Sequence, residues 1–458
     1  MKAGVKIFQI AACALIIMSL VACATKPEYK FKYDSDAALR DSLKIAPAYP
    51  QTSFVVFCDP HIYDPSLGTS GQAFENYLDD DRKLLRESAE IMQAAVDEIK
   101  QVEAGFVLVP GDMTKDGERS SHELCINYLR EIEASGKQVY VVPGNHDINN
   151  GASVKYIGNT TERVPNITHS EFAEMYGDFG YKGALYRDNA SLSYVAEPQS
   201  GLWLLALDSC RYNENLENQK PVTDGKLGTD TLRWTEEMLE KAATYKNAVI
   251  VMVHHGVVEH YIGQQKNFGE YIVDDYPEIS KLLAAYNARL VFTGHYHAQD
   301  ITEVSWKQPD KFVFDIETGS LVTYPSPYRI INIDSSQRAT VRTEHVGSIP
   351  SHPDDFQEYA RAYVLSGIQG IATHTIMGYK VNQAEAQKLA GQVAQAFVAH
   401  YAGDENLPPG QEALQASGLS IPGRLVVNFR KDLVIGLWHD LPPPDNNITI
   451  DLKTGTWQ

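Results

Sequence analysis

Short runs of strand-favouring residues alternate with amphipathic stretches over most of the chain, and this alternation constrains the fold more than any other feature. The strand-like runs lie at 53–58, 106–109, 138–142, 202–207, 248–253 and 290–292. Helical periodicity occupies 82–102, 118–135, 229–243 and 276–287. Thr168 and Glu171 have the spacing of a capping box, which predicts one more helix. Strands that alternate with helices predict an α/β domain whose strands are mostly parallel.

The second half of the chain has a different pattern. Runs at 311–317, 328–333 and 339–344 follow one another without helices and predict a second, antiparallel portion. After residue 353 the pattern is helical at 354–368 and 383–402, and 424–438 is compatible with a hairpin. With 458 residues there is room for two or three domains. We therefore expect an α/β domain over 51–349 and a small, mainly helical C-terminal domain over 350–458, with no metal ligand or catalytic base in the latter.

The N-terminal segment has the features of an export signal. Two lysines precede an apolar run from residue 7 to 21, which is too short to span a membrane comfortably. The run ends in Leu20-Val21-Ala22-Cys23, which looks like a bacterial lipobox. This pattern predicts a signal peptide over 1–22, a lipid attached to Cys23, a tether over 23–50 and a protein anchored to a membrane of the cell envelope. The alternative is a plain signal anchor in which Cys23 is incidental.

Charge and cysteine content exclude some classes of function. The net charge of -19 argues against stable binding of nucleic acids, which requires basic surfaces. Beyond the predicted tether start, Cys58, Cys125 and Cys210 form no C-x-x-C motif, so neither a disulfide framework nor a zinc site is indicated. We expect these three thiols to be small buried apolar groups.

Polar, potentially metal-binding residues directly follow five of the predicted strands. Ligands in open α/β sheets bind at the carboxyl ends of the strands, so these residues are expected to meet at one site. One histidine or one Gly-Asp pair after a strand is commonplace, whereas five such segments together indicate a functional site. The five segments are Asp59-Pro60-His61, Gly111-Asp112, Gly144-Asn145-His146-Asp147, His254-His255-Gly256 and Gly294-His295-Tyr296-His297.

This ordered set of motifs resembles the calcineurin-like metallophosphoesterase superfamily, whose pattern is D-x-H, G-D, G-N-H-[DE], an isolated histidine and G-H-x-H. The segments 111–114 and 227–234 look closest to its cyclic-nucleotide phosphodiesterase branch. The resemblance implies a four-layer αββα sandwich, in which two mixed sheets are flanked by helices.

The resemblance also implies a pair of divalent metal ions and their ligands. Asp112 would bridge the two ions, since a carboxylate has two oxygens. Imidazole and carboxylate ligands suit Mn, Fe or Zn better than Mg or Ca. Asp59, His61 and His297 would complete one ion, and Asn145, His254 and His295 would complete the other.

The implied chemistry is hydrolysis of a phosphate ester by a hydroxide that bridges the two metals. Two divalent ions, two carboxylates and one hydroxide leave a net charge of about +1, which matches a phosphodiester. No arginine cluster flanks the motifs, as a monoester dianion would favour. By the same resemblance His146 would donate a proton to the leaving oxygen, oriented by Asp147. A purely structural His146–Asp147 pair is the alternative, and His255 either supports the ligands from behind or turns away.

The sequence thus predicts a metal-dependent phosphodiesterase of the cell envelope, with a small phosphate ester, in particular a cyclic nucleotide, as its substrate. One alternative is a broad-specificity phosphatase or a phospholipid diesterase. An alternative of another class is a non-catalytic binding lipoprotein on the same fold.

Overall fold

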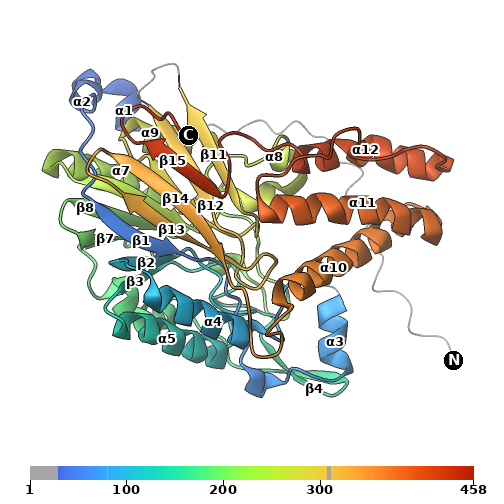
Figure 1. The fold of residues 1–458 in the computed structure, drawn as a ribbon. Helices are drawn as coiled ribbons and strands as arrows, with labels where there is room; N and C mark the ends of the chain where they lie inside the picture. Colours follow the sequence, from blue (N-terminus) through green and yellow to red (C-terminus); the bar gives the residue numbers. More distant parts are fainter. Residues whose placement is uncertain (1–28, 80, 307–310) are drawn as a thin grey trace.

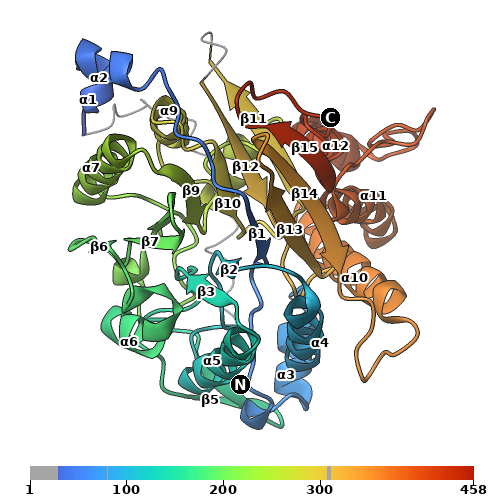
Figure 2. The ribbon, with the colours of Figure 1, turned by 60° about the vertical axis from the view of Figure 1, so that its left-hand side comes forward.

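The structure is a computed structural model that describes residues 29–79, 81–306 and 311–458. It contains two large β-sheets packed face to face, with helices on their outer sides (Figures 1 and 2). The first sheet has the strand order β15-β14-β13-β1-β2-β3, and the second has the order β11-β12-β10-β9-β8-β7-β6. Both sheets are mixed, because β1, β2 and β3 are mutually parallel in the first, β8, β9, β10 and β12 in the second, and the remaining pairs are antiparallel.

The strands agree well with the predicted runs. Those of the first sheet are β1 (Thr52–Val56), β2 (Phe106–Val109), β3 (Gln138–Val141), β13 (Pro327–Ile333), β14 (Arg338–His345) and β15 (Asn447–Asp451). Those of the second are β6 (Tyr186–Arg187), β7 (Tyr194–Gln199), β8 (Leu202–Leu207), β9 (Ala248–Val253), β10 (Leu290–Thr293), β11 (Asp300–Ser305) and β12 (Phe312–Glu317). A separate hairpin consists of β4 (Val154–Ile157) and β5 (Thr160–Arg163).

Helices occupy both outer faces and the C-terminal side. They are α1 (Lys32–Ser35), α2 (Ala37–Ser42), α3 (Gln72–Asp79), α4 (Ser88–Gln101), α5 (Arg119–Ala134), α6 (His169–Met175), α7 (Thr229–Tyr245), α8 (Gln264–Phe268), α9 (Tyr276–Ala285), α10 (Phe356–Gly378), α11 (Gln383–Ala402) and α12 (Ile421–Leu437). The predicted capping box is present at the start of α6. No helix in the described part of the chain is both long and apolar enough to cross a lipid bilayer.

Alternation along β8 shows why the molecule has four layers. Leu202, Leu204 and Ala206 belong to the core between the two sheets, whereas Trp203 and Leu205 face the opposite way and pack in the core beneath α7 and α9. Helices α4 and α5 cover the outer face of the first sheet (Figure 1). The predicted αββα sandwich is therefore confirmed.

The predicted antiparallel portion does not form a separate unit. Strand β12 joins the second sheet beside β10, and β13 and β14 extend the first sheet beside β1. The runs without helices between them predicted a second, antiparallel portion, but pairing with strands far away in sequence places them in the two mixed sheets.

The C-terminal region is mainly helical, and two details differ from the sequence-based expectation. The hairpin predicted at 424–438 was wrong, because α12 occupies this segment. Its Val426, Val427, Val434 and Leu437 share one buried helical face, so tertiary packing outweighs the strand preference of the valines. After the helices the chain returns to the first sheet as β15, which pairs with β14. The domain boundary at residue 350 stays a prediction.

Candidate metal centre

Loops at the carboxyl ends of five strands meet between the two sheets. Those after β1, β2 and β3 come from the first sheet, and those after β9 and β10 come from the second. They bring together all seven predicted ligands, and each is at most 5% exposed. The seven are Asp59, His61, Asp112, Asn145, His254, His295 and His297.

The side chains fall into two neighbouring groups, and Asp112 lies close to a histidine of each. Asp59, His61 and His297 have candidate ligand atoms within 4.8 Å of one another, and so do Asp112, His254 and His295. Asp112 Oδ2 lies 3.6 Å from Nε2 of His61 and 3.5 Å from Nε2 of His254, so it stands between the groups. Asn145 Oδ1 lies 3.2 Å from the same His254 nitrogen. This is the arrangement expected of a bridging carboxylate with three further ligands on either side.

An unusual backbone aims these side chains. Asp59, His61, Asp112, His295 and His297 all have positive φ, between 38° and 76°, although none is glycine. Aspartate and histidine tolerate this left-handed region better than most residues, and such strain concentrates at functional sites. The motif glycines allow the loops to approach closely. A Cβ added at Gly144 would lie 2.1 Å from Asp112 Oδ1, and one added at Gly294 would lie 2.4 Å from Asp59 Oδ2.

At two histidines, the orientation of each ring directs its Nε2 atom into the centre. Nδ1 of His254 lies 2.8 Å from the carbonyl oxygen of Pro110, and Nδ1 of His61 lies 3.3 Å from that of Thr114. Each Nδ1 therefore donates its proton outward, and Nε2 keeps its lone pair. Burial holds the pKa of His61 well below its ordinary value, which favours the neutral, lone-pair-bearing form.

One buried acceptor at the centre lacks a protein partner, and two imidazole nitrogens crowd beside it. Asp59 Oδ1 has no hydrogen bond, and Nε2 of His61 lies 3.1 Å from Nε2 of His297. Buried acceptors left in this state are costly unless a cation lies among them. The donor set, its closeness and its unsatisfied atoms fit a pair of divalent transition metals.

His146 and Asp147 diverge, which corrects one prediction. Nδ1 of His146 lies 3.0 Å from Asp116 Oδ1, and its ring packs edge-on against His61 with centroids 5.0 Å apart. Asp147 accepts hydrogen bonds from the backbone of Met113, Thr114 and Gly144 and from the Thr114 hydroxyl, at 2.9–3.1 Å. Asp147 therefore braces the loops instead of orienting His146, because its oxygens are already occupied by these donors.

Comparison with known proteins assigns the family. Residues 52–299 match the model of the calcineurin-like phosphoesterases, which is more than half of the chain. The chain belongs to this family. Its members are metal-dependent phosphoester hydrolases with dinuclear centres, in agreement with the ligand geometry described above.

Two solved structures illustrate the range of similar proteins. A dimetal phosphatase from Danio rerio is 16% identical with a TM-score of 0.47, and the match covers 66% of this chain and 97% of that one. Purple acid phosphatase PPD1 from yellow lupin (Lupinus luteus) seeds is 12% identical with a TM-score of 0.41, covering 67% and 53%. None of the curated proteins compared matches the chain significantly.

His255 lies behind the centre of this calcineurin-like phosphoesterase. Its Nε2 lies 2.8 Å from the Thr223 carbonyl oxygen, and its Nδ1 lies 2.8 Å from the Ser209 hydroxyl. The His255 ring packs against His295 with centroids 4.4 Å apart. Because protein groups occupy both nitrogens, His255 supports the ligands from behind.

Three polar residues of the site were missed in the sequence. Asp116, which holds His146, follows the Gly-Asp motif by four residues and forms an ion pair with the fully buried Lys115. Arg82 and Lys83 come from the loop after α3, and both lower the pKa of His297, for which burial is the larger cause. Both residues act on His297 electrostatically but belong to none of the five segments, so the motifs gave no sign of them.

Replacing Asp147 with alanine should destabilise the fold before it affects chemistry. Four donors in a buried loop junction would lose their acceptor, and we expect the free energy of unfolding to fall by about 3 kcal/mol or more. Urea unfolding of the metal-free protein measures this directly. Asp178→Ala, which removes a surface carboxylate paired with Lys182, is the control and should change stability little. Equal stability of the Asp147 variant and the wild type would contradict a bracing role.

Proposed function

We propose that this protein hydrolyses phosphodiesters with a pair of Mn, Fe or Zn ions held by the seven clustered residues. The observation that carries the proposal is the shared position of Asp112 between two buried ligand groups. Bound as a pair, such ions supply a nucleophile derived from water and neutralise the charge of the phosphate. Asp59, His61 and His297 would bind one ion, Asn145, His254 and His295 the other, and Asp112 both.

The remaining residues would act on the ester itself. Asp116 fixes Nδ1 of His146, so Nε2 of the ring is free to donate a proton to the leaving oxygen. Lys115, buried beside Asp116, keeps that carboxylate charged and in place. Arg82 and Lys83 add positive charge beside His297, which helps to retain an anionic substrate.

A diester carries a second substituent, and the structure has room for one beside the metal centre. A cavity of about 790 Å³ is lined by Arg82, Tyr271 and Tyr296 at one end. The ring of Tyr271 packs against that of His295 with centroids 4.6 Å apart, so the cavity begins next to a predicted ligand. A simple monoester would leave this volume unused. Cyclic nucleotides are the substrate class that the motifs at 111–114 and 227–234 favour.

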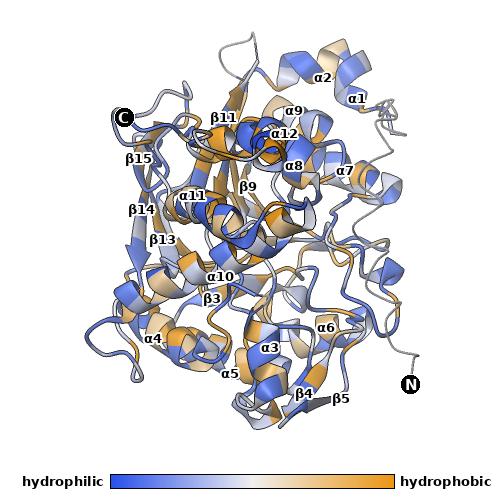
Figure 3. Cartoon of the chain, turned by 90° about the vertical axis from the view of Figure 1, so that its right-hand side faces the viewer, coloured by the Kyte–Doolittle hydropathy of each residue, from blue (hydrophilic) through white to orange (hydrophobic). Residues whose placement is uncertain are grey.

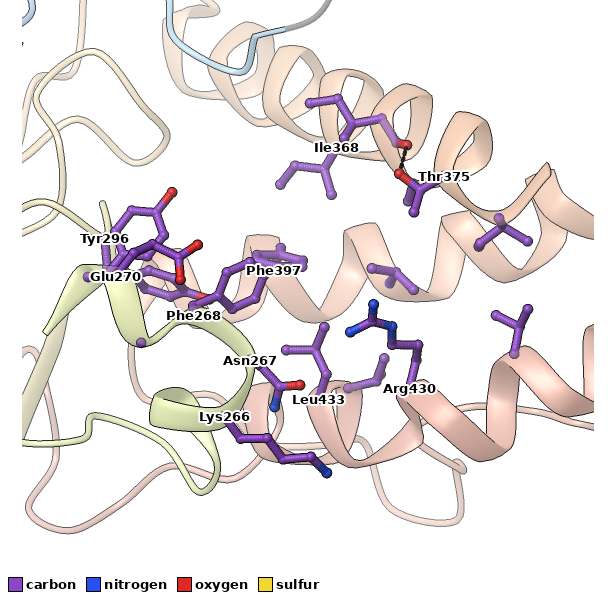
Figure 4. A pocket seen from close by; sticks show the side chains of 18 of the residues that line it. Lys266, Asn267, Phe268, Glu270, Tyr296, Ile368, Thr375, Phe397, Arg430 and Leu433 are labelled. Atoms are coloured by element: carbon purple, nitrogen blue, oxygen red, sulfur yellow. Dashed lines mark hydrogen bonds between the residues drawn. The ribbon is translucent and has the colours of Figure 1, made fainter. Parts of the chain in front are cut away.

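The apolar lining of the same cavity favours a second candidate, a diester with a long hydrocarbon group. Ile368 of α10, Phe397 of α11 and Leu433 of α12 face the cavity from three helices (Figure 4). Helix α12, which also lines the cavity, contains hydrophobic residues among hydrophilic ones (Figure 3). One of its hydrophobic residues, Phe429, is 77% exposed. A cavity of this size and lining suits an acyl chain better than a nucleobase and ribose.

Kinetics on purified protein with added Mn²⁺ separate these possibilities. The panel is a cyclic nucleotide, a short-chain and a long-chain glycerophosphodiester, bis-nitrophenyl phosphate and nitrophenyl phosphate. We expect diesters to exceed the monoester in kcat/KM, with Asp112→Ala as the inactive control. Faster turnover of the monoester than of every diester would overturn the proposal. Phe397→Trp narrows the cavity and should lower kcat/KM for the long-chain substrate alone if that group binds there.

We further propose that the enzyme is attached to an envelope membrane through a lipid on Cys23. This cysteine lies outside the described residues, and the proposal rests on the lipobox-like sequence that precedes it. Cys23→Ser should move the protein from the membrane fraction to the soluble fraction or leave it unprocessed. Mass spectrometry of the mature N-terminus provides the second measurement, and an unmodified N-terminus elsewhere would rule the attachment out.

A further inference from the structure

A cluster of buried ionisable side chains, separate from the metal centre, lies where the end of α11 meets the second sheet. The carbonyl oxygen of Tyr401 accepts a hydrogen bond from the amide of Gln299, which joins α11 to the start of β11 (Figure 1). The cluster contains His260, His400 and Arg329 together with five buried carboxylates. These carboxylates are Asp300, Asp315, Glu317, Glu405 and Asp445.

The positive groups of this cluster are too few for its carboxylates. His260 Nδ1 lies 2.7 Å from Asp300 Oδ1, and His400 Nδ1 lies 2.7 Å from Glu405 Oε1. Arg329 donates to the carbonyl oxygens of Asp445 and Glu317, at 2.5 and 2.6 Å, instead of to a carboxylate. Within the described chain, at most three positive charges of these groups face five buried carboxylates. Buried negative charge in such excess requires added protons or a cation.

Unpartnered atoms show where a cation would bind. Candidate ligand atoms of Asp300, His400 and Glu405 lie within 4.8 Å of one another. His400 Nε2 and Glu405 Oε2 have no hydrogen-bond partner, although the two residues are only 0% and 4% exposed.

We propose that Asp300, His400 and Glu405 bind a third divalent transition-metal ion. One imidazole among carboxylates is a donor set suited to Mn²⁺, Fe²⁺ or Zn²⁺. The ion would connect α11 to β11 and so attach the C-terminal helices to the sandwich. The proposal departs from the expectation that residues 350–458 contain no metal ligand.

The position of this site separates it from the catalytic pair. Its ligands share no residue with the seven of the metal centre. The ring of His400 packs against Tyr296, with centroids 5.6 Å apart, and Tyr296 lies between two predicted ligands in sequence. A third ion would therefore support the wall of the substrate cavity without touching the phosphate.

Counting metal ions in matched variants tests the proposal. The full chain is loaded with Mn²⁺, freed of excess by gel filtration and measured by elemental analysis. We expect about three ions per wild-type chain, about two in Glu405→Gln, which lacks a ligand of the third site, and about one in Asp112→Ala, which lacks the ligand shared by the catalytic pair. The double variant should bind none. His352→Ala, which breaks a surface histidine–aspartate pair at 3.1 Å, is the control and should keep all three.

The variants also distinguish this proposal from the assignment of the catalytic pair. Two ions in both the wild type and Glu405→Gln would overturn the third site and leave shared protons as the source of neutrality. Unchanged metal content in Asp112→Ala would instead count against the catalytic pair. If Glu405→Gln does not fold, the wild-type count decides: about three ions support the third site, and about two overturn it. Glu405→Gln should also retain hydrolysis of bis-nitrophenyl phosphate within about two-fold. Added Mn²⁺ should raise the melting temperature of Glu405→Gln less than it raises that of the wild type.

Discussion

Asp112→Ala should remove both catalytic ions and lower kcat/KM for phosphodiesters by on the order of 10³-fold, equivalent to about 4 kcal/mol of transition-state stabilisation. The reason is its position, since Oδ2 lies within 3.6 Å of imidazole nitrogens from both ligand groups. Elemental analysis and steady-state kinetics on the same preparation provide the two measurements.

A matched variant separates bridging from ordinary ligation. Asp59 belongs to only one ligand group, so Asp59→Ala should lose one ion and retain the other. Circular dichroism of both variants shows whether the fold survives. If the two variants lose the same number of ions, Asp112 does not bridge, and the division of the seven ligands into two sets must be revised.

His146→Ala should reduce hydrolysis of substrates with poor leaving groups by on the order of 10²–10⁴-fold, the usual contribution of a general acid. An alkoxide is a strong base and needs a proton as it leaves, whereas a nitrophenolate does not. The loss should therefore be much smaller on bis-nitrophenyl phosphate, and metal content should stay normal. Equal losses on both substrates would show that His146 holds the phosphate without protonating the leaving group.

The neighbours of His146 provide a sharper version of this experiment. Asp116→Asn weakens the hydrogen bond at Nδ1, so it should reproduce part of the His146 defect, again mainly for poor leaving groups. Asp147, the residue predicted from sequence to orient His146, does not contact its ring nitrogens. A selective kinetic defect in a folded Asp147 variant, with Asp116→Asn unaffected, would restore the sequence-based assignment.

The strand-end residues were predictable because two physical regularities coincide there. Buried parallel strands appear as short continuous apolar runs, and their carboxyl ends meet at one edge of a sheet. His61 and His297, for example, are 236 residues apart in sequence, yet each follows such a run, and their Nε2 atoms lie 3.1 Å apart. The sheet order that brings them together could not be read from the runs themselves.

The residues that sequence reasoning missed share a different property. Arg82 and Lys83 occupy a loop without a motif, so only tertiary packing places them beside His297. Either Asp116 or Asp147 could have oriented His146 as far as the sequence shows, and the loop conformation places Asp116 at its ring. The valines of α12 indicated a hairpin because strand preference is local, whereas the helix is stabilised by a face buried against α11 and the core around Tyr261.

The left-handed backbone at five of the predicted ligands has a consequence for how such a protein could diverge. Most side chains cannot occupy these positions without strain, but asparagine and glycine can. A descendant that no longer needed its ions would therefore tolerate Asp112→Asn or His295→Asn more readily than a change to valine or leucine. The loops would keep their conformation although metal binding and activity were lost. Inactive relatives of this enzyme should therefore be recognisable by asparagine or glycine at residues 59, 61, 112, 295 and 297.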